Sequence, residues 1–306
     1  MTTPPPDLVS LSLTLRPAAP PPPNANPPAW WGRAAHALLL KVVRQADENL
    51  ANELHENGST LRPFTASTLI GYSQQRGIEM ERLYSLRLTG LNQEVSTHLL
   101  NASQAGGALQ AGQAIALDYF PFQVVDNSLQ SETDPAGPPA AQARRGLSGR
   151  TSYQALSAPY LLAKTQPERQ VSLKFFSPAS WKSAAGMHIP LPMPELVFNS
   201  LLNRWNAFAP VAFPGELRRY AAECLAISRY RLSSRTIPQK RGSQRIGCVG
   251  EATYTSVHYD RYWMSLAQTL ADYAFYAGVG INTTQGMGQC WRARPPARDG
   301  QRRGEE

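Results

Sequence analysis

Cysteine is scarce in this chain, and its three copies argue against two common kinds of site. Cys224, Cys248 and Cys290 are an odd number, lie far apart and form no C-x-x-C motif. The sequence therefore supports neither a disulfide framework nor a thiolate zinc site. We expect a protein of the reducing cytoplasm that uses no metal ion or other cofactor.

Long apolar runs are also missing. The proline-rich N-terminus lacks the apolar run of a signal peptide, and the longest apolar stretch, Ala34–Leu40, is interrupted by His36. A membrane-spanning helix needs about 20 apolar residues, so we expect no membrane partner. The chain does contain 306 residues that are 42% hydrophobic, which is enough for the cores of two domains of ordinary size.

Acidic residues are the minority charge. The sequence holds 22 Asp and Glu against 30 Lys and Arg, which leaves a net charge of +8 at pH 7. A positive excess favours polyanionic partners such as nucleic acids, because phosphate contacts release counterions. Many soluble proteins of similar charge bind no nucleic acid, so composition alone leaves the partner open.

The N-terminal half shows strand and helix periodicities in turn. Val9–Leu15 alternates apolar and polar residues, which predicts a strand with one solvent-exposed face. Apolar residues at helical spacing predict an amphipathic helix over Arg33–Ala46. Asp47 is placed to cap a second, short helix that ends at His55. Further strands are expected at Phe64–Ile70, Glu81–Thr89 and Ala114–Phe122, and a helix at Gln93–Asn101.

A stretch poor in bulky apolar side chains, Asp126–Arg150, predicts a linker between two domains. We place an N-terminal domain at residues 1–130, a linker at 131–150, a C-terminal domain at 151–291 and a disordered tail at 292–306. The second domain should contain strands at Gln170–Ser177, Ala222–Leu232 and Gln244–Val257, and helices at Pro194–Phe208 and Tyr262–Ala277. The pattern predicts an α+β fold of two antiparallel sheets, each with helices on one face.

The segment Gly278–Gln289 is rich in glycine and follows the last predicted helix. It resembles the glycine-rich loop of the RAMP superfamily of CRISPR-associated proteins. Other passages are similar, in the same order, to the repeat-processing endoribonucleases of that superfamily: Leu50–Glu56, Arg62–Ser67, Phe175–Pro178, Pro192–Pro194, Asn203–Asn206 and Gly247–Gly250. The resemblance extends from about Arg33 to Gln289.

This resemblance implies two tandem ferredoxin-like (RRM-like) domains with a glycine-rich loop near the C-terminus. It also implies a protein that binds CRISPR repeat RNA and cleaves precursor transcripts into guide RNAs. Some relatives carry a tyrosine where this chain has Leu40. A leucine side chain cannot transfer a proton. An alternative therefore stays open, in which the chain is a catalytically inactive RNA-binding subunit whose partners are the other subunits of a CRISPR effector complex.

Two segments are candidate RNA contacts. Glycines let backbone N–H groups approach phosphates closely, and hydroxyl and amide side chains add donors; in the glycine-rich loop the candidates are Gly278, Gly280, Thr283, Thr284, Gln285, Gly286, Gly288 and Gln289. The alternative without RNA contact is a helix that ends at Gly278, followed by a tight hairpin. The second segment is a mobile, basic hairpin around Ser233–Gln244, with candidates Arg231, Arg235, Lys240, Arg241 and Arg245. An ordinary exposed loop is the alternative there.

RNA can be cut without a metal ion when its 2′-hydroxyl attacks the adjacent phosphorus, leaving a 2′,3′-cyclic phosphate and a 5′-hydroxyl. The reaction needs a base, an acid and cations, and histidine suits both proton transfers. His55 corresponds to the histidine of the family's Leu-His-Glu passage, although it could instead only cap its helix. Arg62 corresponds to a downstream lysine and keeps the positive charge without donating a proton. His36 lies one turn before Leu40 on the same helix, so it is a candidate for the missing proton carrier.

Overall fold

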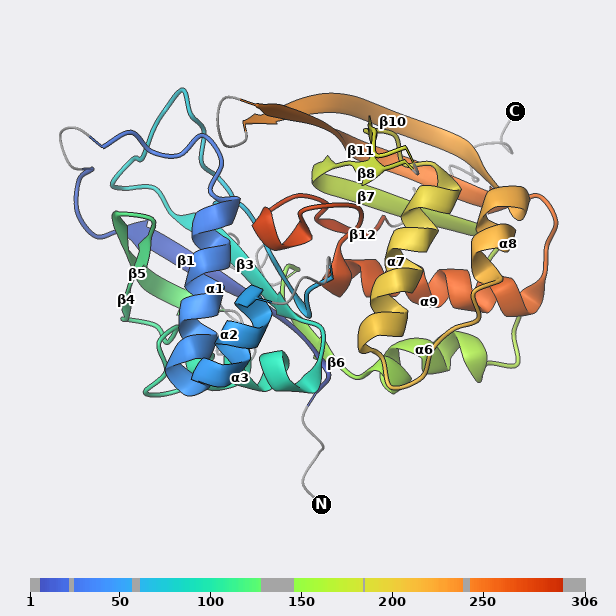
Figure 1. Cartoon of the computed structure of the whole chain (residues 1–306), viewed down its shortest axis with the longest axis horizontal. Coiled ribbons are helices and arrows are strands. Elements are labelled where there is room, and N and C mark those ends of the chain that lie inside the picture. Colours follow the sequence, from blue (N-terminus) through green and yellow to red (C-terminus); the bar gives the residue numbers. More distant parts are fainter. Residues whose placement is uncertain are drawn as a thin grey trace, which may run out of the picture.

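The computed structural model describes residues 6–21, 25–56, 61–127, 146–183, 185–238 and 243–293. Two α+β units lie side by side, the N-terminal one coloured blue to green in Figure 1 and the C-terminal one yellow-green to red. Each unit has its own buried apolar core. Within the described residues, no helix is long and apolar enough to cross a membrane.

The N-terminal unit is built on one antiparallel sheet with the order β2-β3-β1-β5-β4. Its strands are β1 (Leu8–Pro17), β2 (Phe64–Ala66), β3 (Tyr84–Gly90), β4 (Ala114–Leu117) and β5 (Phe120–Asn127); its helices are α1 (Gly32–Ala46), α2 (Glu48–Glu56) and α3 (Gln93–Ser103). Apolar side chains of α1 and α3 pack on one face of this sheet. The connection β1-α1-β2-β3-α3-β5 is the ferredoxin-like arrangement that the resemblance implied.

The C-terminal unit repeats the same arrangement with the order β10-β11-β7-β12. The repeated elements are β7 (Gln170–Ala179), α7 (Pro194–Phe208), β10 (Leu225–Pro238), β11 (Gln244–Ser256), α9 (Arg261–Ala277) and β12 (Cys290–Arg292). The additions are β6 (Gly149–Thr151), α6 (Tyr153–Leu161), the hairpin of β8 (Trp181–Lys182) and β9 (His188–Ile189), α8 (Leu217–Cys224) and the 3-10 turn η2 (Thr283–Gln285). The predicted pair of ferredoxin-like units is therefore confirmed.

Local sequence signals account for several element ends. The Asp47 side chain accepts a hydrogen bond from the backbone N–H of Leu50 at 2.9 Å, which caps α2 as predicted. Asp260 caps α9 in the same way through the N–H of Trp263. Helix α9 ends at Gly278, whose φ of +60° favours glycine.

The expectation of a solvent-exposed face on the first strand was wrong. Ser10 and Ser12 are buried, as are the apolar residues between them. The second face of the N-terminal sheet packs against the end of α9, and the Ser10 hydroxyl donates to the carbonyl of Leu147 at 2.6 Å. Alternation along the strand thus separates an apolar core from a polar interface between the two units.

Arg87 lies at the centre of that interface and is only 1% exposed. Its guanidinium donates to Ser10 Oγ at 2.8 Å, to Leu147 O at 3.0 Å, to Gln289 Oε1 at 2.6 Å and to Phe275 O. Burial lowers the pKa of Arg87 to about 9, so it stays charged at neutral pH. One side chain of β3 therefore joins β1, the end of α9 and the end of the glycine-rich loop.

Several other observed element boundaries differ from the predicted ones. The expected strand at Ala114–Phe122 is a hairpin of two strands, β4 and β5, and the start of Ala222–Leu232 belongs to α8. Strand β6 begins inside the predicted linker and pairs with β1. Arg292, expected in a disordered tail, lies in β12 and forms a 2.5 Å ion pair with Asp272. Most of the predicted linker, 131–145, and most of the predicted tail, 294–306, lie outside the described residues.

Candidate catalytic site and nucleic-acid interface

The glycine-rich loop is packed between the two units instead of forming an open phosphate cradle. A Cβ on Gly288 would lie 1.9 Å from the Val279 carbonyl oxygen, and one on Gly280 would lie 2.3 Å from that of Ser180. Gly278, Gly280, Gly286 and Gly288 all have positive φ values. These glycines are needed because the backbone turns sharply and its neighbours leave no room for a side chain.

Most of the predicted RNA contacts in this loop are buried. Gly278, Gly280, Thr283, Gly286, Gly288 and Gln289 are all buried. The N–H groups of Gly278, Gly280, Gly288 and Gln289 donate to protein oxygens, and Gln289 Oε1 accepts from Arg87. These N–H groups already have partners inside the protein, although Gly280 and Thr283 also line a cleft between the two units. Thr284 and Gln285 are half-buried and remain candidates.

Arg204 of α7 holds the loop from the C-terminal side. Its Nη2 donates to Gly280 O at 2.6 Å and to Thr283 Oγ1 at 3.2 Å, while Nη1 donates to Ser200 Oγ at 2.6 Å. Burial lowers the pKa of Arg204 to about 10, which leaves it charged at neutral pH. Sequence reasoning included Arg204 in a family-like passage but did not single it out, because nothing local indicates that it reaches a loop distant in the sequence.

The start of α1 holds the loop from the N-terminal side. The Trp30 indole donates to Gln285 O at 2.7 Å, and a Cβ on Gly32 would lie 1.7 Å from the same oxygen. His36 Nδ1 lies 3.2 Å from Thr284 O, and its ring centre is 5.3 Å from that of Phe64. The histidine that sequence reasoning ranked second is therefore in direct contact with the loop.

His36 has the properties of a neutral imidazole. Burial is the largest influence and lowers its pKa below 6.5; the hydrogen bond with Thr284 opposes this, and the positive charges of Arg62 and His55 lower the pKa further. Only a protonated Nδ1 can donate to a carbonyl, so the neutral ring has its lone pair on Nε2. The influence of both charges on His36 puts the three predicted catalytic residues in one neighbourhood.

His55 is exposed at the end of α2. Its backbone carbonyl accepts a hydrogen bond from Arg62 Nη2 at 3.4 Å. Arg62 itself is half-buried and precedes β2. The N-terminal unit thus presents two imidazoles and a guanidinium near the loop.

A cleft of about 620 Å³ opens between the two units, and Arg62 and Thr284, the loop residue that contacts His36, are among the residues that line it. Its principal polar and charged lining comes from Arg62, Lys182, Asn199, Asn203, Arg204, Arg245 and Asn282. Four of these residues carry positive charge, and none of the described residues that line the cleft is acidic. A cationic cleft is suited to a phosphate backbone.

Residues 173–290 match the family described as "CRISPR-associated endoribonuclease Cas6". This part of the chain, in the C-terminal unit, is thus similar to the Cas6 family. The structure of Thermus thermophilus Cas6 matches with a TM-score of 0.65 at 22% identity, and that of its product complex with 0.71 at 22%. The product complex of another Cas6 matches with 0.66 at 23%. All three cover 94% of this chain and 99% of the other, and at such identities they establish the shared fold. A comparison with curated proteins gives no match.

The long β10–β11 hairpin reaches from the C-terminal unit toward α1 (Figure 1). Ile237 near its tip is buried, and Pro238 lines a small hollow together with Trp30 and Arg33. Strand β10 extends to Pro238 instead of ending at the expected Leu232, so the part Ser233–Pro238 of the predicted mobile segment is paired strand. Arg231 and Arg235 are exposed on β10, whereas Arg245 lines the cleft. Lys240 and Arg241 lie outside the described residues.

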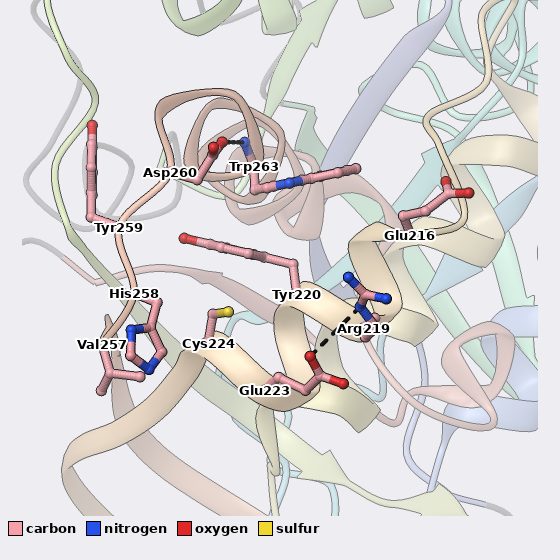
Figure 2. Close-up of a pocket in the computed structure, with 10 residues that line it drawn as sticks. All are labelled: Glu216, Arg219, Tyr220, Glu223, Cys224, Val257, His258, Tyr259, Asp260 and Trp263. Carbon is pink, nitrogen blue, oxygen red and sulfur yellow. Dashed lines mark hydrogen bonds and ion pairs between the residues drawn. The ribbon is translucent and has the colours of Figure 1, made fainter.

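A second cavity, of about 610 Å³, lies at the far end of the C-terminal unit (Figure 2). The rings of Tyr220 and Trp263 stack in its wall with centres 6.2 Å apart, and the exposed His258 lies beside them. Among the described residues that line it, the carboxylates of Glu216, Glu223 and Asp260 outnumber the cation of Arg219. This negative balance does not suit RNA, and no predicted site residue lines the cavity. Among the described residues, no group of three or more His, Cys, Asp or Glu side chains is placed to hold a metal ion.

Proposed function

We propose that this chain is an endoribonuclease that binds CRISPR repeat RNA and cuts precursor transcripts into guide RNAs without a metal ion. The observation that carries the proposal is His36, an imidazole with a lowered pKa that is anchored to the glycine-rich loop near His55 and Arg62. The cationic cleft that Arg62 lines accommodates the RNA backbone. The family match over residues 173–290 supports the same reaction class.

In the proposed reaction, Nε2 of His36 accepts the proton of the 2′-hydroxyl while its oxygen bonds to the adjacent phosphorus. A lowered pKa suits this role because the ring is unprotonated at neutral pH. His55 donates a proton to the departing 5′-oxygen as the phosphorus–oxygen bond breaks. Arg62 stabilises the charge of the phosphorane. The products are a 2′,3′-cyclic phosphate and a 5′-hydroxyl.

One observation favours a second candidate function. Leu40, at the position where some relatives carry a tyrosine, is only 9% exposed and packs in the N-terminal core. If His36 does not replace that tyrosine, the chain retains the RNA-binding surface and lacks catalysis. It then serves as an RNA-binding subunit of a CRISPR effector complex.

The test is an incubation in EDTA with a transcript that carries the repeat of the host's CRISPR array. We expect one cut per repeat, ending in a cyclic phosphate, and loss of cutting in His36→Gln and in His55→Ala with repeat binding kept within a few-fold. His258→Ala, a change in the remote second cavity, is the matched control and should cut normally. Binding without any cut would favour the non-catalytic subunit, and a cut that requires a divalent ion would exclude the metal-independent reaction.

A further inference from the structure

In the part of the chain that the structure describes, the C-terminal sheet has helices on one face only (Figure 1). Along β7, Val171, Leu173 and Phe175 are buried in the core, whereas Lys174 is half-buried and Phe176 is exposed. Successive side chains of a strand point to opposite faces. Lys174 and Phe176 therefore belong to the open face, away from α7 and α9.

One row of side chains crosses this open face through all four strands. Arg231 of β10 is paired with Glu251 of β11, Glu251 with Lys174 of β7, and Lys174 with Trp291 of β12. Residues directly opposite each other in antiparallel strands share one face. The row therefore has an arginine at one end and an indole at the other.

The aromatic end of the row carries an accessible ring. Phe176 is 44% exposed and stacks on Trp291, with 23° between the two ring planes. The Lys174 ammonium lies 5.0 Å from the centre of the Phe176 ring. One side of the Phe176 ring is covered by Trp291, and its exposure leaves an apolar surface beside a cation.

The charge on the open face is predominantly positive. Arg229 and Arg235 are exposed and lie on the same side of β10 as Arg231, since they are separated from it by even numbers of residues. Glu251 forms a 3.3 Å ion pair with Lys174, but both side chains are nearly half exposed, and exposed pairs of this kind are weak. A strand spacing of about 4.8 Å places β10 roughly 15 Å from β12, three spacings away.

We propose that this face binds single-stranded RNA, with unpaired bases stacked on Phe176 and phosphates held by Lys174 and Arg231. Bases stack on exposed aromatic rings of four-stranded sheets, and such sheets hold two or three nucleotides. A positive face with an accessible ring fits this ligand because the ligand combines flat bases with negative charge. The inference rests on the proposed function: the bound nucleotides are unpaired ones that flank the repeat.

The first experiment measures the dissociation constant of a fluorescein-labelled oligoadenylate by anisotropy. Phe176→Ala should weaken binding about 10-fold, because the loss of one stacked base costs about 1–3 kcal/mol. Phe176→Tyr keeps an aromatic ring and should bind like the wild type. Tyr119→Ala removes a ring that is 83% exposed in the N-terminal unit, so it is the matched control and should change nothing.

A salt titration tests the charged part of the row. Arg231→Gln should reduce the dependence of log affinity on log salt by about 0.7, the contribution of one phosphate contact in single-stranded nucleic acid. Equal oligoadenylate affinity in the wild type and Phe176→Ala would overturn the proposal. So would a wild-type dimer that Phe176→Ala converts to monomers with unchanged RNA affinity, since the face would then join copies of this chain.

Cleavage separates this inference from the proposed function. Phe176→Ala should still cut a repeat that lacks single-stranded flanks at the wild-type rate. If the wild type cuts no repeat and oligoadenylate binding still depends on Phe176, the endonuclease proposal fails and the binding face stands. If the wild type cuts normally and Phe176 has no effect on binding, the binding face alone is refuted.

Discussion

Replacing Arg87 by methionine should destabilise the protein more than any surface change of the same kind. The substitution retains much of the apolar stem and removes all donors of a side chain that is 1% exposed. Four acceptors then lose a charged partner: Ser10 Oγ, Leu147 O, Gln289 Oε1 and Phe275 O. The cation also leaves the ring of Phe275, whose centre is 4.4 Å from the guanidinium carbon.

The expected loss follows from these contacts. A buried acceptor left without a partner costs about 1–3 kcal/mol, and Ser10 and Leu147 keep the hydrogen bond between them. Because contributions within one network do not add, we expect a loss of about 3–5 kcal/mol in the free energy of unfolding, comparable with breaking a buried ion pair. The free energy of unfolding of a domain is about 5–15 kcal/mol in total, so the variant should be close to unfolding.

Urea denaturation measures the effect, and Arg82→Met is the matched control. Arg82 is partly exposed and pairs with Glu79 at 3.1 Å within one turn of chain; losing such a pair costs about 0–1 kcal/mol. A shift for Arg87→Met as small as that for Arg82→Met would refute the view that Arg87 holds the two units together. In a folded Arg87→Met variant we also expect slower RNA cleavage, because Gln289 ends the loop that positions His36.

Two further predictions concern the loop and its histidine. Because the pKa of His36 lies below 6.5 in the folded state, the unfolded chain takes up the proton first. This histidine should therefore leave stability unchanged above pH 6.5 and reduce it as the pH falls below that value. In the pH–rate profile of cleavage, the midpoint of the acidic limb should likewise lie below pH 6.5. A midpoint at or above pH 6.5 would contradict the role of His36 as a neutral base. Gly288→Ala places a Cβ 1.9 Å from Val279 O at a φ of +66° and should cost about 2–4 kcal/mol in urea denaturation. Gly215→Ala, which meets only the end of an arginine side chain, should cost far less, and equal losses would contradict the close packing.

Local patterns in the chain were sufficient for much of the fold. The helix at Pro194–Phe208 was predicted with its observed bounds because its start is marked by proline and its apolar residues recur at helical spacing. Asp47 was correctly predicted as a cap, since a cap involves only neighbouring residues. The tandem ferredoxin-like arrangement came from the resemblance to a family, because periodicity defines the faces of elements but not the order of strands in a sheet.

The environment of the candidate site depended on contacts between distant segments. His36 meets Thr284 across 248 residues of sequence, and Arg204 meets Gly280 across 76. The glycines of the loop indicated a close approach, but they could not indicate that protein, not phosphate, occupies the space. Likewise, polar alternation in β1 identified a second face but not what covers it. The burial and the pKa of a group depend on everything packed around it. The neutral state of His36 and the burial of Arg87 therefore arise only when the two units pack together.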